Sequence, residues 1–210
     1  MTTAQDLMIV AVDLAPGRSV EAGDLSLALA GAELLDLVEA GAITLDGDRV
    51  VPNPQEPIGD RLFGDRLLDE ASAALTRQSP YESVEDWLWR RGRGLSAGYL
   101  KAWEAEGPED KKRHRWLPSR TQQPAPAADS PTRLRAEERW VSDEPVLLAL
   151  ATAAGVRERT ADDPLDAAGA ADDSTVTVLA AVNDAVMELE AVRQRRAIEN
   201  AAFDNVWRGL

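Results

Sequence analysis

The sequence predicts a mainly α-helical protein with one or two small β-hairpins. Apolar residues recur at helical spacing over most of the chain. An Asp-Gly dipeptide between two short apolar runs is typical of a hairpin. A chain of 210 residues, 44% of them hydrophobic, can bury a substantial core without disulfides or bound metals. We therefore expect a single helical domain over residues 1–210.

The first half of the chain carries the clearest element boundaries. Thr3-Ala4-Gln5-Asp6 resembles a capping box before the apolar run 7–12, which predicts a short helix. The apolar stretch 25–38 predicts a longer helix that ends at Gly41. The remaining predicted elements are hairpin strands at 42–45 and 49–51 around Asp46-Gly47-Asp48, and helices at 65–78, 83–89, 99–106, 134–140, 146–154 and 176–207.

Two segments lack periodicity and are expected to be loops. Residues 121–132 are rich in Pro and Ala, and residues 160–173 are rich in Asp and Ala. Five tryptophans fall in or beside the predicted helices, which favours a packing role for each of them: Trp87, Trp89, Trp103, Trp140 and Trp207.

Composition excludes several kinds of chemistry. The chain has no Cys and a single His, His114, so disulfides, zinc fingers and triads of ordinary type are excluded or nearly so. The adjacent acids Asp69 and Glu70 point about 100° apart on a helix and cannot act together on one atom. We expect no enzyme activity, no metal site and no cofactor. The longest apolar run is interrupted by acids, and no basic, signal-like segment precedes residue 7, which indicates a cytoplasmic protein.

Charge is distributed unevenly along the chain. The net charge is −14, yet residues 90–120 hold nine basic and four acidic side chains, a net charge of +5, so the rest carries −19. These cations could simply neutralise the acidic surface of the same molecule. Alternatively, they could form an anion site, since guanidinium groups bind phosphate bidentately. The predicted headgroup-binding residues are Arg90, Arg91, Arg93, Lys111, Lys112, Arg113 and Arg115.

Trp116 and Leu117 follow directly after the basic run 111–115. An indole beside basic residues suits the interface of an anionic membrane, where each basic residue contributes about 1 kcal/mol of attraction. We therefore predict that Trp116 and Leu117 enter the membrane interface, and that the partner is an anionic membrane lipid.

Two motifs at a fixed distance carry a family resemblance. Gly64-Asp65-Arg66-Leu67-Leu68-Asp69-Glu70-Ala71 is followed by Pro80-Tyr81-Glu82-Ser83-Val84-Glu85-Asp86-Trp87-Leu88, and the upstream segment 31–45 looks like a helix that turns into a strand. Together they resemble the Golgi phosphoprotein 3 family, most closely its bacterial, actinobacterial-type branch. The resemblance extends over most of residues 5–155.

This resemblance implies a helical domain that binds phosphatidylinositol 4-phosphate and docks peripherally on membranes. The match is incomplete at the positions that bind the headgroup in the family. Its headgroup Trp corresponds to Val20 or Glu21 in this sequence, and one of its arginines corresponds to Ala30. Of two later arginines, one coincides with Arg93 and the other falls near Ser96. The resemblance therefore supports membrane association more strongly than it supports specificity for phosphoinositides.

Two further functions remain as alternatives. The chain could be a protein-interaction or regulatory adaptor whose lipid site has decayed. The helix and hairpin at 25–51 could also form a winged helix, but they carry acids where DNA binding requires Lys or Arg, so we expect no nucleic-acid partner. The sequence leaves the oligomeric state open.

Overall fold

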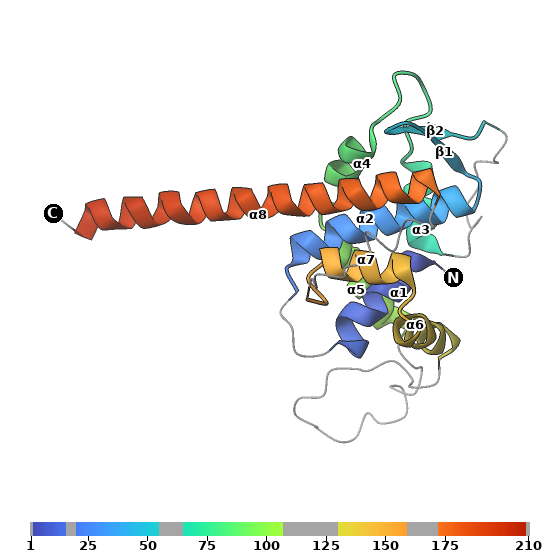
Figure 1. Ribbon diagram of the computed structural model, residues 1–210, viewed down its shortest axis with the longest axis horizontal. Coiled ribbons are helices and arrows are strands. Elements are labelled where there is room, and N and C mark those ends of the chain that lie inside the picture. Colours follow the sequence, from blue (N-terminus) through green and yellow to red (C-terminus); the bar gives the residue numbers. More distant parts are fainter. Residues whose placement is uncertain (1, 16–19, 55–64, 107–129, 159–171, 209–210) are drawn as a thin grey trace.

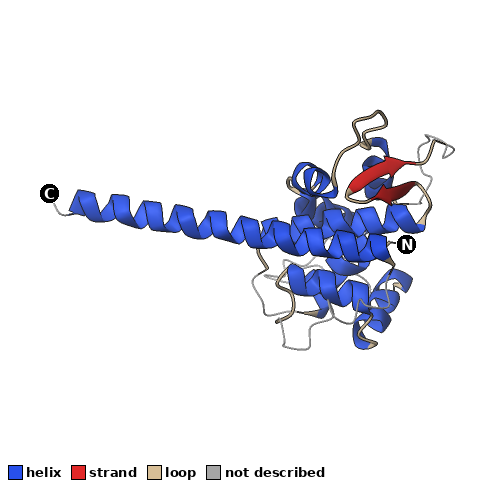
Figure 2. Ribbon diagram, turned by 45° about the horizontal axis from the view of Figure 1, so that its top comes forward, coloured by secondary structure: helices blue, strands red, loops and turns tan. Residues whose placement is uncertain are grey.

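The computed structural model describes residues 2–15, 20–54, 65–106, 130–158 and 172–208, with side chains up to Ala105 in the fifth helix and Ala201 in the last one. These residues form a mainly helical fold with one antiparallel hairpin (Figure 1, Figure 2), so the predicted fold class is confirmed. In chain order the elements are α1 (Thr3–Ile9), the π-helical turn η1 (Val10–Leu14), α2 (Ala22–Glu39), β1 (Ile43–Asp46), β2 (Arg49–Pro52), α3 (Arg66–Ala73), α4 (Val84–Arg91), α5 (Leu95–Glu106), α6 (Pro131–Val141), α7 (Pro145–Ala153) and α8 (Asp173–Arg208).

Helix α2 is the centre of the fold. It contacts α1, α3, α4, α5, α7 and α8, and every side chain from residue 25 to residue 37 is buried. Its two interior acids are each hydrogen-bonded, Glu33 to Arg91 and Asp36 to the N–H of Thr3, which allows carboxylates inside an apolar helix. A helix buried on all sides cannot enter a DNA groove, so the winged-helix alternative is wrong.

The predicted helix stop and hairpin are both confirmed. Gly41, two residues beyond the end of α2, has a φ of +72°, a conformation that glycine adopts without strain. In the hairpin Asp46 pairs with Arg49, which leaves a two-residue loop. Its first residue, Gly47, has a φ of +60°, as a type II′ turn requires.

Helix α1 begins one residue earlier than its sequence suggests. The hydroxyl of Thr2, rather than Thr3, accepts the N–H of Gln5 at 3.2 Å. The N–H groups of Thr3 and Ala4 donate instead to the carboxylate of Asp36 in α2, at 2.7 and 3.1 Å. The carboxylate of Asp36, from a distant helix, therefore caps two N–H groups in the first turn of α1, in place of a local acid as in the expected capping box.

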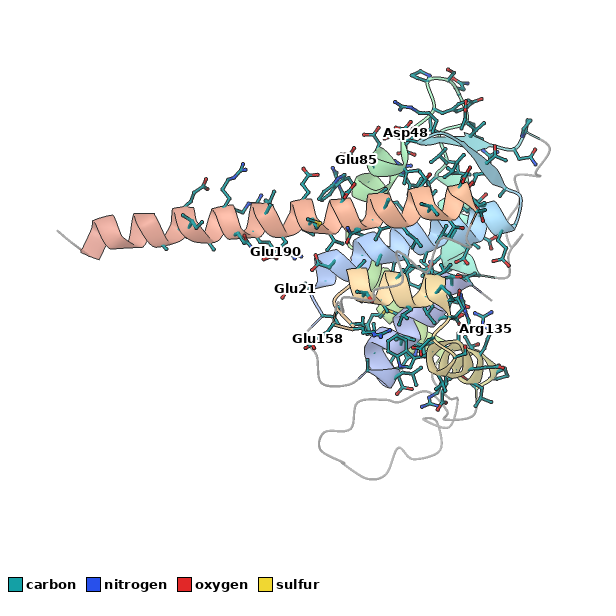
Figure 3. All side chains as sticks on the ribbon, in the orientation of Figure 1. Glu21, Asp48, Glu85, Arg135, Glu158 and Glu190 are labelled. Carbon is teal, nitrogen blue, oxygen red and sulfur yellow. The ribbon has the colours of Figure 1, made fainter. Side chains whose placement is uncertain are left out.

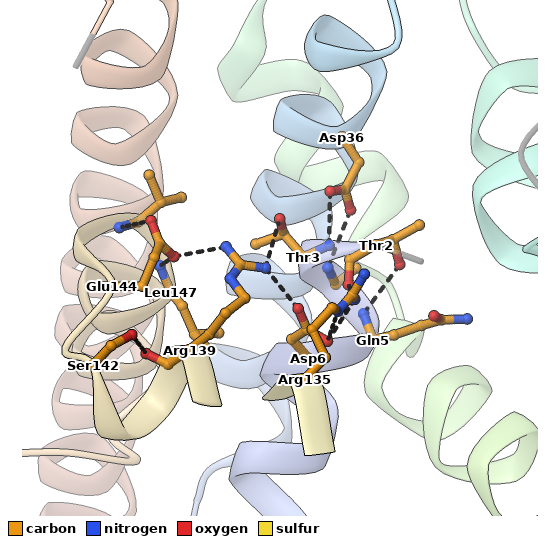
Figure 4. Close-up of polar contacts among 12 residues, drawn as sticks. Thr2, Thr3, Gln5, Asp6, Asp36, Arg135, Arg139, Ser142, Glu144 and Leu147 are labelled. Atoms are coloured by element: carbon orange, nitrogen blue, oxygen red, sulfur yellow. Dashed lines mark hydrogen bonds and ion pairs between the residues drawn. The ribbon is translucent and has the colours of Figure 1, made fainter. Parts of the chain in front are cut away.

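A buried carboxylate joins α6 to α1 (Figure 4). Asp6 is fully buried and accepts from Arg135 and Arg139, each at 2.6 Å. Arg139 also donates to Glu144 at 2.6 Å, and Glu144 caps the first turn of α7. One acid in the first helix thus fixes the position of two later helices, although 129 and 133 residues separate it from its partners.

Other boundaries differ from the sequence prediction by a few residues. Ser130 caps α6, so the last two residues of the predicted 121–132 loop are helical. Helix α3 stops at Ala73 rather than at residue 78, and α8 begins at Asp173. Residues 121–129 and 160–171, the remainder of the two predicted loops, lie outside the described part of the chain.

The packing role is confirmed for three of the tryptophans. Trp87 is fully buried, and its indole N–H donates to the carbonyl of Ala30 at 3.1 Å. Trp89 and Trp140 are half-buried against the same core. Trp103 is also half-buried, and the Trp207 side chain lies outside the described residues.

Gly31 sets how closely α2 and α8 approach each other. A Cβ at this position would lie 2.3 Å from Cγ2 of Val182. We expect Gly31→Ala to lower the free energy of unfolding by about 1–3 kcal/mol through overpacking. Gly98→Ala is the matched control, since its Cβ would meet only Leu67, at 3.9 Å; it should stabilise α5 by up to about 1 kcal/mol. Urea denaturation tests both, and an unaltered Gly31→Ala variant would contradict the close packing.

Candidate functional site

The sequence-predicted arginines Arg90, Arg91 and Arg93 lie at the end of α4 and in the turn that leads to α5. Gly94 in this turn has a φ of +70°, and α5 begins at the next residue, Leu95. Consecutive helix residues point about 100° apart. The structure therefore brings the three arginines to one place but directs each of them to different surroundings.

Arg91 points into the protein. Its Nε and Nη2 donate to the two carboxylate oxygens of Glu33 at 2.7 and 2.8 Å, and Nη2 also donates to the carbonyl of Leu67 at 2.9 Å. The hydroxyl of Tyr99 donates to the same carboxylate at 3.1 Å. With its side chain only 15% exposed, Arg91 is an internal ion-pair partner of α2.

Burial raises the pKa of Glu33, while Arg91 and Tyr99 act in the opposite direction by stabilising its charged form. Burial also raises the pKa of the Tyr99 phenol, and the negative charge of Glu33 adds to this effect. For Arg91, burial opposes the charge, but the hydrogen bonds and charge of Glu33 raise its pKa. The two guanidinium nitrogens of Arg91 on the two oxygens of Glu33 give the geometry of a bidentate ion pair, to which the Tyr99 hydroxyl adds a third donor.

Arg90 lies on the surface but has intramolecular partners. Its Nε and Nη2 donate to the carboxylate of Glu82 at 2.6 and 2.7 Å, and Nη2 also donates to the carbonyl of Ala74 at 3.2 Å. The guanidinium carbon lies 5.1 Å from the ring centroid of Trp87, which is a cation–π distance. The hydrogen bonds to Glu82 raise the pKa of Arg90. One edge of the guanidinium is thus occupied, and 44% of the side chain remains exposed.

Arg93 has different surroundings. Its side chain is exposed and makes no ion pair or hydrogen bond with the described residues. It lines an open cavity of about 330 Å³ between the start of α2, the end of α4, the start of α5 and α8. Trp89 and Leu189 supply apolar parts of its wall. Arg93 is therefore the member of the predicted basic set, within the described residues, that is available to an external anion.

Ser26 and Ser96 line the same cavity, but their hydroxyl groups are hydrogen-bonded to each other. Their hydroxyl oxygens are 2.8 Å apart, and the hydroxyl of Ser26 donates to the carbonyl of Ala22 at 2.6 Å. The N–H of Ser96 donates to the Ser26 hydroxyl at 3.1 Å. Among the described residues that line the cavity, Arg93 therefore supplies the positive charge available to a ligand. A single guanidinium can bind one phosphate or carboxylate group bidentately.

Helix α8 forms one side of this cavity. Leu189 lies in the wall, and one turn further along Arg193 pairs with Asp24 at 2.8 Å. A Cβ on Gly23 would lie 2.8 Å from side-chain atoms of both α8 residues. Glycine at the start of α2 thus permits the close approach of α8 beside Arg93.

A second cavity, of about 590 Å³, lies between α1, the start of α3, α5 and the start of α6. Lys101 and Arg66 line it together with the indole of Trp103, whose buried N–H has no hydrogen-bond partner in the described part of the chain. Its volume is in the range of small-molecule sites. Sequence reasoning missed this cavity because its lining comes from segments far apart in the chain.

The remaining predicted site residues belong to the segment 111–117. Lys111, Lys112, Arg113, Arg115, Trp116 and Leu117 lie outside the described residues, as does His114. Their role in membrane binding stays a prediction. Within the described residues, no group of three or more potential His, Asp or Glu ligands is arranged to hold a metal ion, and no helix is long and apolar enough to cross a membrane.

The fold and the site define a mainly helical domain with a small hairpin and an open, singly cationic cavity at the start of its central helix. The family model for Golgi phosphoprotein 3 (GPP34) matches residues 4–196, so the chain belongs to the Golgi phosphoprotein 3 family. This family is not a known enzyme family. Comparison with curated proteins and with solved structures finds no match.

Proposed function

We propose that the chain is a non-enzymatic peripheral membrane protein of the family's bacterial branch that binds anionic lipid headgroups from the cytoplasm. Family membership is consistent with a role in binding phosphatidylinositol 4-phosphate or as an adaptor. The observation that carries the proposal is the exposed Arg93, without a partner among the described residues, at a cavity beside the start of α2. The family resemblance also places one of the family's two later arginines on Arg93, and the other falls near Ser96.

Lipid binding through this cavity would be assisted by the basic segment. In this proposal Lys111, Lys112, Arg113 and Arg115 attract the membrane surface, and Trp116 and Leu117 enter its interface. Each basic residue near an anionic surface contributes about 1 kcal/mol. Because Arg93 alone supplies positive charge within the described cavity, we propose broad selectivity for anionic lipids, with phosphatidylinositol 4-phosphate as one ligand among them.

Vesicle flotation tests this function. We expect the protein to float with phosphatidylcholine vesicles that contain phosphatidylglycerol or phosphatidylinositol 4-phosphate, and not with phosphatidylcholine alone. Arg93→Glu should weaken binding about thirtyfold, because it removes one attraction and adds one repulsion, each of about 1 kcal/mol. Charge reversal of Lys111, Lys112 and Arg113 together should abolish flotation.

Arg66→Glu is the matched control for charge. Arg66 is 65% exposed at the first position of α3 and pairs with Glu70, so its reversal changes the net charge equally at a different surface. It should leave flotation nearly unchanged. Equal recovery with neutral vesicles, or equal effects of the Arg66 and Arg93 reversals, would contradict headgroup binding at the cavity.

The adaptor function remains the second candidate, and a specific observation favours it. Arg90 and Arg91 donate to Glu82 and Glu33, so their guanidinium groups are engaged by the fold itself. The family's headgroup Trp and one Arg are also replaced in this sequence. Absence of flotation with every anionic lipid, together with recovery of one stoichiometric protein partner from a lipid-free lysate, would favour this alternative.

A further inference from the structure

The second cavity, between α1, α3, α5 and α6, is separate from the cavity of Arg93. The two cavities share no lining residue within the described part of the chain. The volume of the second cavity, about 590 Å³, lies in the range in which small organic ligands bind. Headgroup binding at Arg93 would therefore leave this cavity free for a different ligand.

Hydrogen bonds between the helices fix the walls of this cavity. Asp65, at the start of α3, accepts from the hydroxyl of Thr2, which precedes α1, at 3.1 Å. Figure 3 labels Arg135 on α6, whose guanidinium donates to Asp6 and holds α6 against α1. The hydroxyl of Tyr99 joins α5 to α2. A cavity whose walls are fixed in advance binds a ligand at a smaller entropic cost.

The buried part of the wall is aliphatic. Met8, Ile9 and Leu67 line the cavity and are all buried. Ala102 and Trp103 extend this apolar surface along α5. Methionine has an unbranched, flexible side chain that adapts to the shape of its neighbours. This wall favours a ligand with an alkyl chain, since apolar area removed from water stabilises a complex.

The charged residues of the wall favour an anion. Within the described residues, the charged members of the lining are Asp65, Arg66 and Lys101. Both carboxylate oxygens of Asp65 already accept hydrogen bonds from the fold, and Arg66 pairs with Glu70. Lys101 is exposed and makes no ion pair or hydrogen bond with the described residues, and Glu104, one turn further along α5, does not line the cavity. The ammonium group of Lys101 is therefore available to a ligand.

An unpaired donor lies in the same wall. Trp103 lines the cavity, and its buried indole N–H has no acceptor among the described residues. Most buried polar groups in proteins are hydrogen-bonded, and an unpaired one lowers stability. The free ammonium group and the unpaired N–H both favour a ligand that carries a negatively charged oxygen.

We propose that this cavity binds a single-chain amphiphilic anion of the fatty-acid class, with its carboxylate at Lys101 and its alkyl chain against Met8, Ile9 and Leu67. The aliphatic wall accounts for the chain, and the unpaired ammonium group accounts for the carboxylate. A cationic amphiphile with a chain of the same length buries the same apolar area but brings two positive charges together, so it binds more weakly. The site is independent of headgroup binding at Arg93.

Isothermal titration calorimetry with laurate tests the site. Dodecyltrimethylammonium is the comparison, because its alkyl chain has nearly the same length and its charge is opposite. Both are used below the concentrations at which they form micelles. We expect one laurate to bind per chain, and dodecyltrimethylammonium to bind more weakly by about tenfold or more. Equal affinities would overturn the assignment of an anionic ligand, and absence of laurate binding would overturn the site.

Two substitutions on α5 test where laurate binds. Lys101→Glu should weaken its binding about tenfold, because it removes one attraction and adds one repulsion at a partly exposed position. Ala102→Phe should weaken it by about tenfold or more, because the added ring occupies space that the chain needs. Circular dichroism checks that each variant is folded. Lys101 is exposed, so its variant decides the question even where Ala102→Phe disturbs the fold.

Each substitution has a matched control. Ala97→Phe makes the same change on the same helix, but Ala97 lines the cavity of Arg93, and five helical positions place the side chains of Ala97 and Ala102 about 140° apart. Arg195→Glu reverses an exposed charge on α8. Both controls should leave laurate binding unchanged. An affinity for laurate that is insensitive to Lys101→Glu and Ala102→Phe, or that falls equally in the controls, would overturn the proposal.

Discussion

Arg91→Met is expected to lower the free energy of unfolding by about 3–5 kcal/mol, although Arg91 belongs to a basic run that suggests a surface role. The substitution leaves Glu33, which is fully buried in α2, without its cationic partner. Only the 3.1 Å hydrogen bond from Tyr99 remains on that carboxylate. Urea denaturation at neutral pH, with fluorescence detection, measures the loss.

The neighbouring arginine provides the control for this prediction. Arg90→Met removes a guanidinium of the same kind, but that side chain is 44% exposed, and such pairs contribute about 1 kcal/mol or less. The double variant Arg91→Met with Glu33→Leu should recover much of the stability, because it removes the uncompensated carboxylate. Equal losses of unfolding free energy in the Arg90 and Arg91 variants would show that burial of the ion pair does not determine the effect on stability.

The pH dependence of Arg91→Met gives a second measure of the same interaction. Burial raises the pKa of Glu33, and Arg91 is the largest of the groups that oppose this shift. Without Arg91 the pKa of Glu33 rises further, so the folded variant holds a proton that the unfolded chain releases. A raised carboxyl pKa favours the folded state at low pH. The stability difference from wild type should therefore become smaller as the pH falls.

Local signals in the sequence predicted most of the fold. The glycine after α2 and the Asp46-Gly47 pair mark positions where the backbone needs a positive φ at Gly41 and Gly47, and the structure has one at each. The helical spacing of the apolar residues predicted the positions of the helices. The first cap was misplaced because Asp36, which accepts from the N–H groups of Thr3 and Ala4, comes from a helix more than thirty residues away. No local pattern carries that information.

The candidate site was predictable only in part. A run of cations in the sequence indicated the turn between α4 and α5, and Arg93 does lie at a cavity there. The sequence could not show that Arg91 pairs with Glu33, which lies 58 residues earlier. On a helix, successive side chains point in different directions. Within the described residues, the three arginines at the start of this run therefore have three different roles: Arg91 forms an internal ion pair, Arg90 forms a surface ion pair, and Arg93 is available to a ligand.

The contact between α2 and α1 leads to the last prediction, a loss of stability as the pH rises from about 4 to 6. Burial raises the pKa of Asp36 from 3.8 to about 6, although the N–H groups of Thr3 and Ala4 act to lower it. Between these two values the folded state binds a proton that the unfolded state has released. Stability consequently falls with increasing pH over this interval and becomes constant above it.

Asp36→Asn isolates this contribution, since asparagine keeps the shape and one acceptor oxygen but does not titrate. Relative to wild type, the variant should gain about 2 kcal/mol between pH 4 and pH 7. The raised pKa of Glu33 acts in the same direction in both proteins, so it cancels in the difference. Urea denaturation at several pH values measures the gain, and carbon NMR of the Asp36 carboxyl should show a midpoint at about 6. Parallel stability profiles for the two proteins, or an NMR midpoint at the ordinary value for Asp, would mean that the α1 amides and solvent compensate fully for burial.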